Sequence, residues 1–160
     1  MKFKFSEQNL DRINNEIKKY PVKQPAVMTA LYIGQEQNGF ISQEVIQEVA
    51  DILEMQAHDV MGVVSFYTMY HQKPMGKYHI QVCTNVSCML RGGYDIWNQV
   101  KDKLGINHLE VTEDSRFSLE EVECMGSCGT APMFAVNEDF YENLTKESAE
   151  QIIESLKNTN

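Results

Sequence analysis

Cysteine, proline and tryptophan are scarce in this sequence of 160 residues, which contains four cysteines, four prolines and one tryptophan. So few cysteines argue against a small secreted scaffold held together by disulfide bonds. The sequence has no run of 18 consecutive apolar residues, and residues 1–20 lack the apolar core of a secretory leader. We therefore expect a cytoplasmic chain with no direct membrane insertion, in which structural disulfides are rare.

Basic residues are also few. Lys and Arg total 14 against 23 Asp and Glu, which gives a formal net charge of −9. This balance repels a polyanion, so we expect no nucleic acid partner. The composition includes 42% hydrophobic residues and predicts a folded protein whose partners are other proteins or small molecules.

The motifs of several common enzyme classes are missing as well. The sequence contains no GxSxG, no HExxH and no GxG among its nine glycines. Their absence argues against serine-hydrolase chemistry, zinc peptidase chemistry and the usual phosphate-binding loops. The four histidines are scattered, and we expect each to be a surface or half-buried polar residue. The chain is thus predicted to have no independent catalytic site.

The first part of the sequence has the apolar spacing of helices. Ser6 and Ser42 each precede apolar residues that recur at helical intervals, so each is expected to cap a helix. A further apolar stretch between these two helices is expected to stop near Gly34 or Gly39. A fourth helix is predicted over about 58–67. These features predict a helical bundle.

A break in this pattern indicates a domain boundary. The segment HQKPMG at 71–76 contains a proline and a glycine, and the period of apolar residues changes after it. We therefore expect a helical domain over 1–73 and a second domain over 74–160.

The second domain mixes strands with helices. KYHIQVC alternates apolar and polar residues as a half-buried strand does, which places Cys83 at the end of that strand. A helix is expected over 91–104, and Thr145 is expected to cap a last helix. Weaker strand patterns occur in RFSLEEVE, MFAVN and DFYENL. The predicted fold class is α+β, with an N-terminal helical bundle followed by an α/β domain.

The four cysteines are arranged as two close pairs, Cys83 with Cys88 and Cys124 with Cys128. Zinc sites usually use C-x2-C, and neither pair has that spacing. A thioredoxin-like dithiol needs only one pair. An iron–sulfur cluster needs four thiolates from loops that wrap it, and the glycine-containing second loop suits this role. The spacing favours a cluster, while a zinc-stabilised interaction module and a dithiol oxidoreductase stay open as alternatives.

The strings FYTMYHQKPMGKYHIQVC, CTNVSC and ECMGSCGTAP resemble the thioredoxin-like [2Fe–2S] ferredoxin family, in particular the small flavoprotein-module subunit of respiratory complex I (NADH:quinone oxidoreductase). The resemblance extends into the helical region through VVSFYTMY. It implies a thioredoxin-like domain in which Cys83, Cys88, Cys124 and Cys128 ligate one [2Fe–2S] cluster. The resemblance leaves open, as an alternative, that the chain is the equivalent subunit of an NAD-linked hydrogenase or formate dehydrogenase.

The resemblance also implies a role and a set of partners. The chain is expected to transfer electrons as a subunit of NADH:quinone oxidoreductase, next to a subunit that binds FMN and NADH. Those two cofactors are expected only on the partner. The helical domain is expected to be a docking element, and the isolated chain is open to association as a homodimer. The expected location is the cytoplasmic, peripheral arm of a membrane-associated complex.

Overall fold

The computed structural model describes residues 2–159, which form two compact units that meet between Pro74 and Met75 in the sequence. Each unit has its own hydrophobic core. The first is built from helices and the second combines helices with a sheet, so the predicted α+β class is confirmed. Within residues 2–159, no helix is both long enough and apolar enough to cross a membrane.

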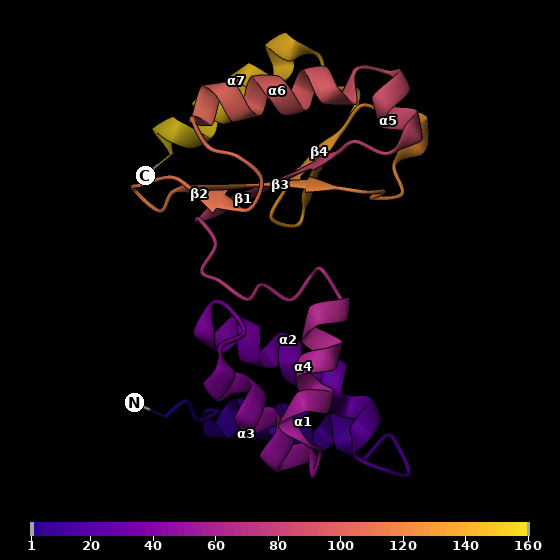
Figure 1. Ribbon diagram of the computed structural model, residues 1–160, viewed down its shortest axis with the longest axis vertical. Coiled ribbons are helices and arrows are strands. Elements are labelled where there is room, and N and C mark those ends of the chain that lie inside the picture. Colours follow the sequence, from indigo (N-terminus) through magenta and orange to yellow (C-terminus); the bar gives the residue numbers. More distant parts are fainter. Residues whose placement is uncertain (1, 160) are drawn as a thin grey trace. The chain divides into compact units, whose positions relative to one another are not determined.

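The first unit is a bundle of four α-helices (Figure 1). They are α1 (Glu7–Ile17), α2 (Val27–Asn38), α3 (Gln43–Leu53) and α4 (Ala57–Phe66). The two predicted caps are confirmed, since Ser6 Oγ accepts the Asn9 N–H and Ser42 Oγ accepts the Val45 N–H. These hydroxyls satisfy backbone donors that the first helical turn leaves unpaired.

Of the two glycines expected to end α2, only Gly39 does so. Gly39 has a left-handed φ of 84°, which a glycine adopts without steric cost. Gly34 instead lies buried inside the helix, where an added Cβ would approach Val45 Cγ1 to 2.6 Å. Gly34 therefore allows α2 and α3 to pack closely.

The second unit contains a five-stranded sheet with the strand order β2-β3-β1-β4-β5. In that order the strands are Glu110–Val111, Phe117–Val122, Tyr78–Cys83, Phe134–Val136 and Asp139–Tyr141. β1 runs parallel to β3 and antiparallel to β4. The helices α6 (Gly93–Leu104) and α7 (Lys146–Asn158) lie together over one face of the sheet (Figure 1).

The expectation of one helix over 91–104 was wrong at its start. The structure has a short helix, α5 (Val86–Leu90), followed by a turn in which Gly92 takes a φ of 91°, and α6 begins only at Gly93. A five-residue helix is too short to show an apolar period in the sequence. The two-residue strand β2 is likewise too short to show the alternation of a strand, so the sequence did not predict it.

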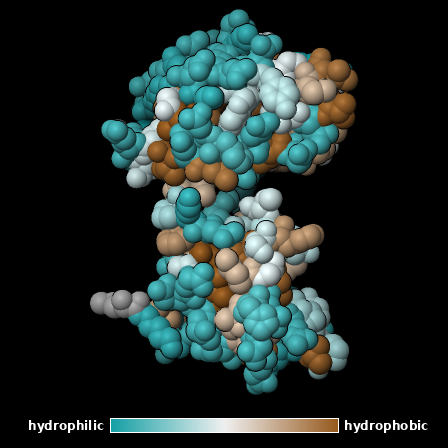
Figure 2. Space-filling model, viewed as in Figure 1, coloured by the Kyte–Doolittle hydropathy of each residue, from teal (hydrophilic) through white to brown (hydrophobic). Residues whose placement is uncertain are grey.

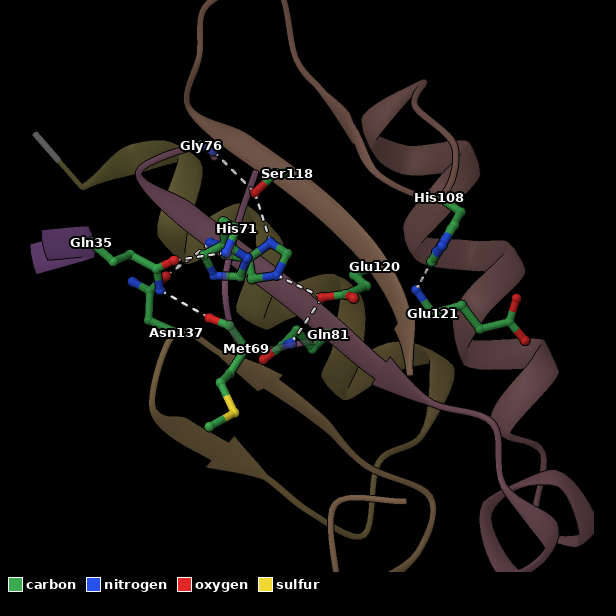
Figure 3. A network of polar contacts seen from close by, with 11 residues as sticks. Gln35, Met69, His71, Gly76, Gln81, His108, Ser118, Glu120, Glu121 and Asn137 are labelled. Atoms are coloured by element: carbon green, nitrogen blue, oxygen red, sulfur yellow. Dashed lines mark hydrogen bonds and ion pairs between the residues drawn. The ribbon is translucent and has the colours of Figure 1, made fainter. Parts of the chain in front are cut away.

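The two faces of the central strands differ in polarity. Ile80 and Leu119 belong to the core that α6 and α7 cover. His79, Ser118 and Glu120 alternate with them and point to the opposite face. There His79 Nδ1 lies 2.8 Å from Ser118 Oγ and its Nε2 lies 3.0 Å from Glu120 Oε2. Figure 3 labels Ser118 and Glu120, and its dashed lines join both to one imidazole ring. The expectation of a surface or half-buried histidine was wrong for His79, which is buried because a neighbouring strand supplies polar partners for both ring nitrogens.

Candidate metal centre

The first cysteine pair lies where β1 ends and α5 begins. Cys83 is the last residue of β1, as predicted, and Cys88 lies within α5. Asn85 begins the helix, and its side-chain oxygen accepts the Val86 N–H at 2.8 Å. Both cysteines are only 3% exposed. This loop therefore turns two thiols into the protein rather than toward solvent.

The second pair lies in the loop that follows β3. Cys124 and Cys128 are both exposed, and their Sγ atoms are 3.7 Å apart. Gly126 lies between them with a φ of 84°, and its N–H donates to Cys124 Sγ at 3.4 Å. A left-handed residue at this point reverses the chain, so that the two thiols of the loop meet.

The sheet brings these two loops to the same end of its strands. β1 and β3 are parallel neighbours, and Cys83 pairs in register with Val122. The chain therefore leaves both strands at one end of the sheet. Two side-chain contacts join the loops. Asn85 Nδ2 donates to Glu123 Oε2 at 2.9 Å, and the Cys83 thiol donates to the Glu123 carbonyl oxygen at 2.9 Å.

The thiols also affect one another electrostatically. Burial raises the pKa of Cys88 to about 11, with further contributions from a hydrogen bond to Cys83 and from the charges of Cys83 and Cys128. Cys83 and Cys88 form a small apolar cluster with Ala131 and Met133, against which Met125 packs. Cys88 of the first pair thus interacts electrostatically with Cys128 of the second pair, and the first pair is largely shielded from water.

All four predicted site residues are free cysteines. Within residues 2–159, no group of three or more His, Cys, Asp or Glu side chains has the arrangement of a single metal-ion site. The thiols instead form two linked pairs. An all-sulfur donor set suits a [2Fe–2S] cluster, in which four thiolates serve two irons. The donor chemistry of the four cysteines therefore fits this cofactor.

Gly93 supports this site and was not identified from the sequence. An added Cβ at Gly93 would lie 2.8 Å from the carbonyl carbon of Cys88 and 3.0 Å from the carbonyl oxygen of Cys83. The helix α6 can therefore begin directly against the backbone of both cysteines. The only signal in the sequence was the Gly92-Gly93 pair, which marks a turn or a close backbone approach.

The second unit is thus a thioredoxin-like domain that carries four free thiols at one end of its sheet. The family model described as thioredoxin-like [2Fe-2S] ferredoxin matches residues 13–157. The chain belongs to this family, which confirms the resemblance inferred from the sequence. The family cofactor is a [2Fe–2S] cluster.

Several known proteins are similar to this chain. A protein of Rickettsia bellii, named as a subunit of NADH-quinone oxidoreductase, is 46% identical over 159 residues, which cover 98% of this chain and 95% of that protein. NADH dehydrogenase [ubiquinone] flavoprotein 2, mitochondrial, of Dictyostelium discoideum is 40% identical, with 98% of this chain and 64% of that protein covered.

A solved structure extends the comparison to the fold. The NAD+-reducing [NiFe]-hydrogenase in its H2-reduced state matches with a TM-score of 0.74 and 19% identity, covering 85% of this chain and 23% of the hydrogenase chain. At this level of identity, the match demonstrates a shared fold.

Proposed function

We propose that this chain is the electron-transfer subunit of an NADH:quinone oxidoreductase and that Cys83, Cys88, Cys124 and Cys128 ligate its [2Fe–2S] cluster. The observation that carries the proposal is the meeting of two free thiol pairs at one end of a thioredoxin-like sheet. The relatives named as parts of NADH-quinone oxidoreductase and NADH dehydrogenase support the assignment, because they match 98% of the chain.

The bound cluster supplies one-electron chemistry at iron. The protein prepares the ligands for it. Each cysteine would hold iron as a thiolate, so cluster binding would release to solvent the proton that the Cys83 thiol donates to the Glu123 carbonyl oxygen. The Gly126 N–H donates to the sulfur of Cys124 and stabilises negative charge there. Burial of Cys83 and Cys88 keeps water from half of the donor set.

The electron donor in this proposal is a neighbouring subunit that holds FMN and NADH. A hydride carries two electrons, so a flavin is needed before a one-electron carrier. An exposed apolar patch formed by Val86, Met89 and Leu90 on α5 lies beside the first cysteine pair. Figure 2 shows apolar atoms gathered at this end of the second unit. This α5 patch gives the flavin-bearing partner a surface close to the thiols.

The helical unit is the second docking element in this proposal. Phe66 is 76% exposed at the end of α4, and its ring contacts the exposed Tyr67. The buried Tyr70 contacts both Tyr67 and the exposed Tyr32, so the four rings form one aromatic cluster. Exposed aromatic side chains are frequent energetic centres of protein interfaces. With its partners bound to these two surfaces, the chain would belong to the cytoplasmic, peripheral arm of the complex.

Metal and sulfide analysis of the purified chain tests the cofactor assignment. We expect two irons and two acid-labile sulfides per chain, with the reddish-brown colour of such clusters. Replacement of any one of the four cysteines by alanine is expected to remove most of the bound iron, because each supplies a quarter of the ligands. Stoichiometric zinc without sulfide, or an unchanged visible spectrum in one of the variants, would contradict the corresponding part of the assignment. Sedimentation of the same sample measures whether the isolated chain forms a homodimer.

A further inference from the structure

The loop that carries the second cysteine pair depends on side chains from elsewhere for its position. Both of its cysteines are exposed, and the short 3-10 helix Cys128–Thr130 begins without a side-chain cap from any described residue. Asn85 and Cys83 bind Glu123 at the start of this loop, and Gly126 donates to Cys124. The polar contacts around Cys128 involve residues 127–131. We call residues 127–131 the Cys128 segment.

Glu142 holds the Cys128 segment from the turn that follows β5. The hydroxyls of Ser127 and Thr130 flank Cys128, and both donate to the same Glu142 oxygen, with the Thr130 contact at 2.6 Å. The two hydroxyl oxygens also lie 2.8 Å from each other. A backbone bond from the Asn143 N–H to the Thr130 oxygen, at 2.7 Å, strengthens this connection. One carboxylate thus fixes the residues on both sides of Cys128.

Arg91 holds the same segment from the side of the first cysteine pair. Its guanidinium Nη1 donates to the carbonyl oxygens of Gly129 and Ala131, at 3.3 and 3.4 Å. The Arg91 backbone N–H donates to the Cys88 oxygen at 3.1 Å. Arg91 therefore connects the chain around Cys88 with the chain around Cys128.

Arg91 and Glu142 carry opposite charges and act on one short segment. Reduction of a cluster adds one negative charge, which a nearby cation favours and a nearby anion opposes. We propose that Arg91 and Glu142 are positioning residues for Cys128 and that their charges shift the reduction potential of the cluster in opposite directions. This inference rests on the proposed ligand set.

Redox titration of the full-length chain with dithionite as the electron donor, followed by electron paramagnetic resonance, tests the inference. Arg91→Gln should lower the midpoint potential, and Glu142→Gln should raise it while keeping a side-chain oxygen as acceptor. We expect each reduction equilibrium to change by up to about tenfold, which corresponds to about 59 mV for one electron. The double variant should return close to the wild-type potential because the two changes cancel.

Matched control variants test whether a shift in potential comes from a charge beside the Cys128 segment or from the net charge of the chain. Lys101→Gln in α6 and Glu138→Gln at the other end of the β4–β5 hairpin alter the charge of the chain equally but lie outside the Cys128 segment and its polar contacts. Lys101→Gln should shift the midpoint potential less than Arg91→Gln does, and Glu138→Gln should shift it less than Glu142→Gln does. Arg91→Lys keeps the charge and should retain most of the wild-type potential, even if it binds less iron.

The outcomes distinguish the inference from the proposed function. If the wild-type chain holds two irons and two sulfides while Arg91→Gln and Glu142→Gln shift the potential in the same direction or not at all, the inference is overturned and the proposed function stands. Loss of iron without opposite shifts would indicate a purely structural role and would also overturn it. A wild-type chain without iron and sulfide would instead remove the proposed function on which the inference depends.

Discussion

Gly93 lies against the backbone of Cys88 so closely that a side chain at this position would place its Cβ 2.9 Å from the Cys88 carbonyl oxygen. Backbone atoms at this distance cannot move aside as the tip of a flexible side chain can. We therefore expect Gly93→Ala to displace the first cysteine pair and to lower stability by about 1–3 kcal/mol. Thermal unfolding and iron content measure the two effects.

Gly62 provides the control for this prediction. It also lies in a helix, and, apart from its chain neighbours and the backbone of its own helix, an added Cβ there would meet no atom of the described residues within 4 Å. Because alanine favours helix formation over glycine by about 1 kcal/mol, Gly62→Ala should be neutral or stabilising. Equal tolerance of both substitutions would show that the contact at Gly93 does not constrain the cysteine loop.

The exposed ring of Phe66 is expected to contribute to partner binding. Phe66→Ser should weaken association with the flavin-bearing subunit by about 2 kcal/mol, or about thirtyfold, since aromatic side chains often dominate interface energies. Val22→Ser is the matched control, because Val22 is 57% exposed and lies outside the aromatic cluster that contains Phe66. Calorimetric titration with the partner measures both variants. A similar loss in the two variants would indicate general surface apolarity rather than a contact at Phe66.

NADH alone is expected not to reduce the purified chain. The sequence lacks a GxG motif, and its net charge of −9 disfavours binding of a pyrophosphate. Anaerobic mixing with NADH should therefore leave the visible absorption unchanged, whereas dithionite should bleach it. Addition of the flavin-bearing subunit should allow reduction by NADH. Bleaching by NADH in a flavin-free sample would show that this chain contains a hydride-accepting site.

We expect the buried hydroxyl of Tyr70 to make the folded protein less stable in alkaline solution. It is 3% exposed, its hydroxyl donates to the Met28 carbonyl at 3.0 Å, and burial raises its pKa from an ordinary value of 10 to about 12. The folded state thus favours the neutral phenol. The contribution of this group to the free energy of unfolding is fully present below pH 10 and is lost as the pH rises through about 12. A shift of two pKa units changes the free energy of unfolding by at most about 3 kcal/mol.

Comparison with a phenylalanine variant isolates this effect. Tyr70→Phe removes the titrating group and the hydrogen bond, so it should be less stable by about 1 kcal/mol at neutral pH but lose less stability on alkalinisation. Urea unfolding across the alkaline range measures the difference. Tyr94→Phe, at an exposed tyrosine, is the control and should follow the wild-type curve. Parallel curves for wild type and Tyr70→Phe would exclude Tyr70 as the source.

The sequence by itself determined the features that depend on near neighbours. Helical and strand periods and the caps at Ser6 and Ser42 arise within a few residues, so they could be read directly. The spacing of the cysteines, together with the resemblance of the surrounding strings, likewise predicted the family and its cofactor. The assignment of individual cysteines as ligands stays a prediction.

Tertiary structure decided the features that join distant parts of the chain. The carboxylate of Glu142 reaches Ser127 and Thr130 only because the β4–β5 hairpin folds back beside the loop of Cys128. His79 is buried because strand pairing brings it to Ser118 and Glu120, and its own neighbours in sequence give no sign of this. Strand pairing and loop contacts depend on which distant segments meet, and a pattern of period two or 3.6 specifies only which face of an element is apolar.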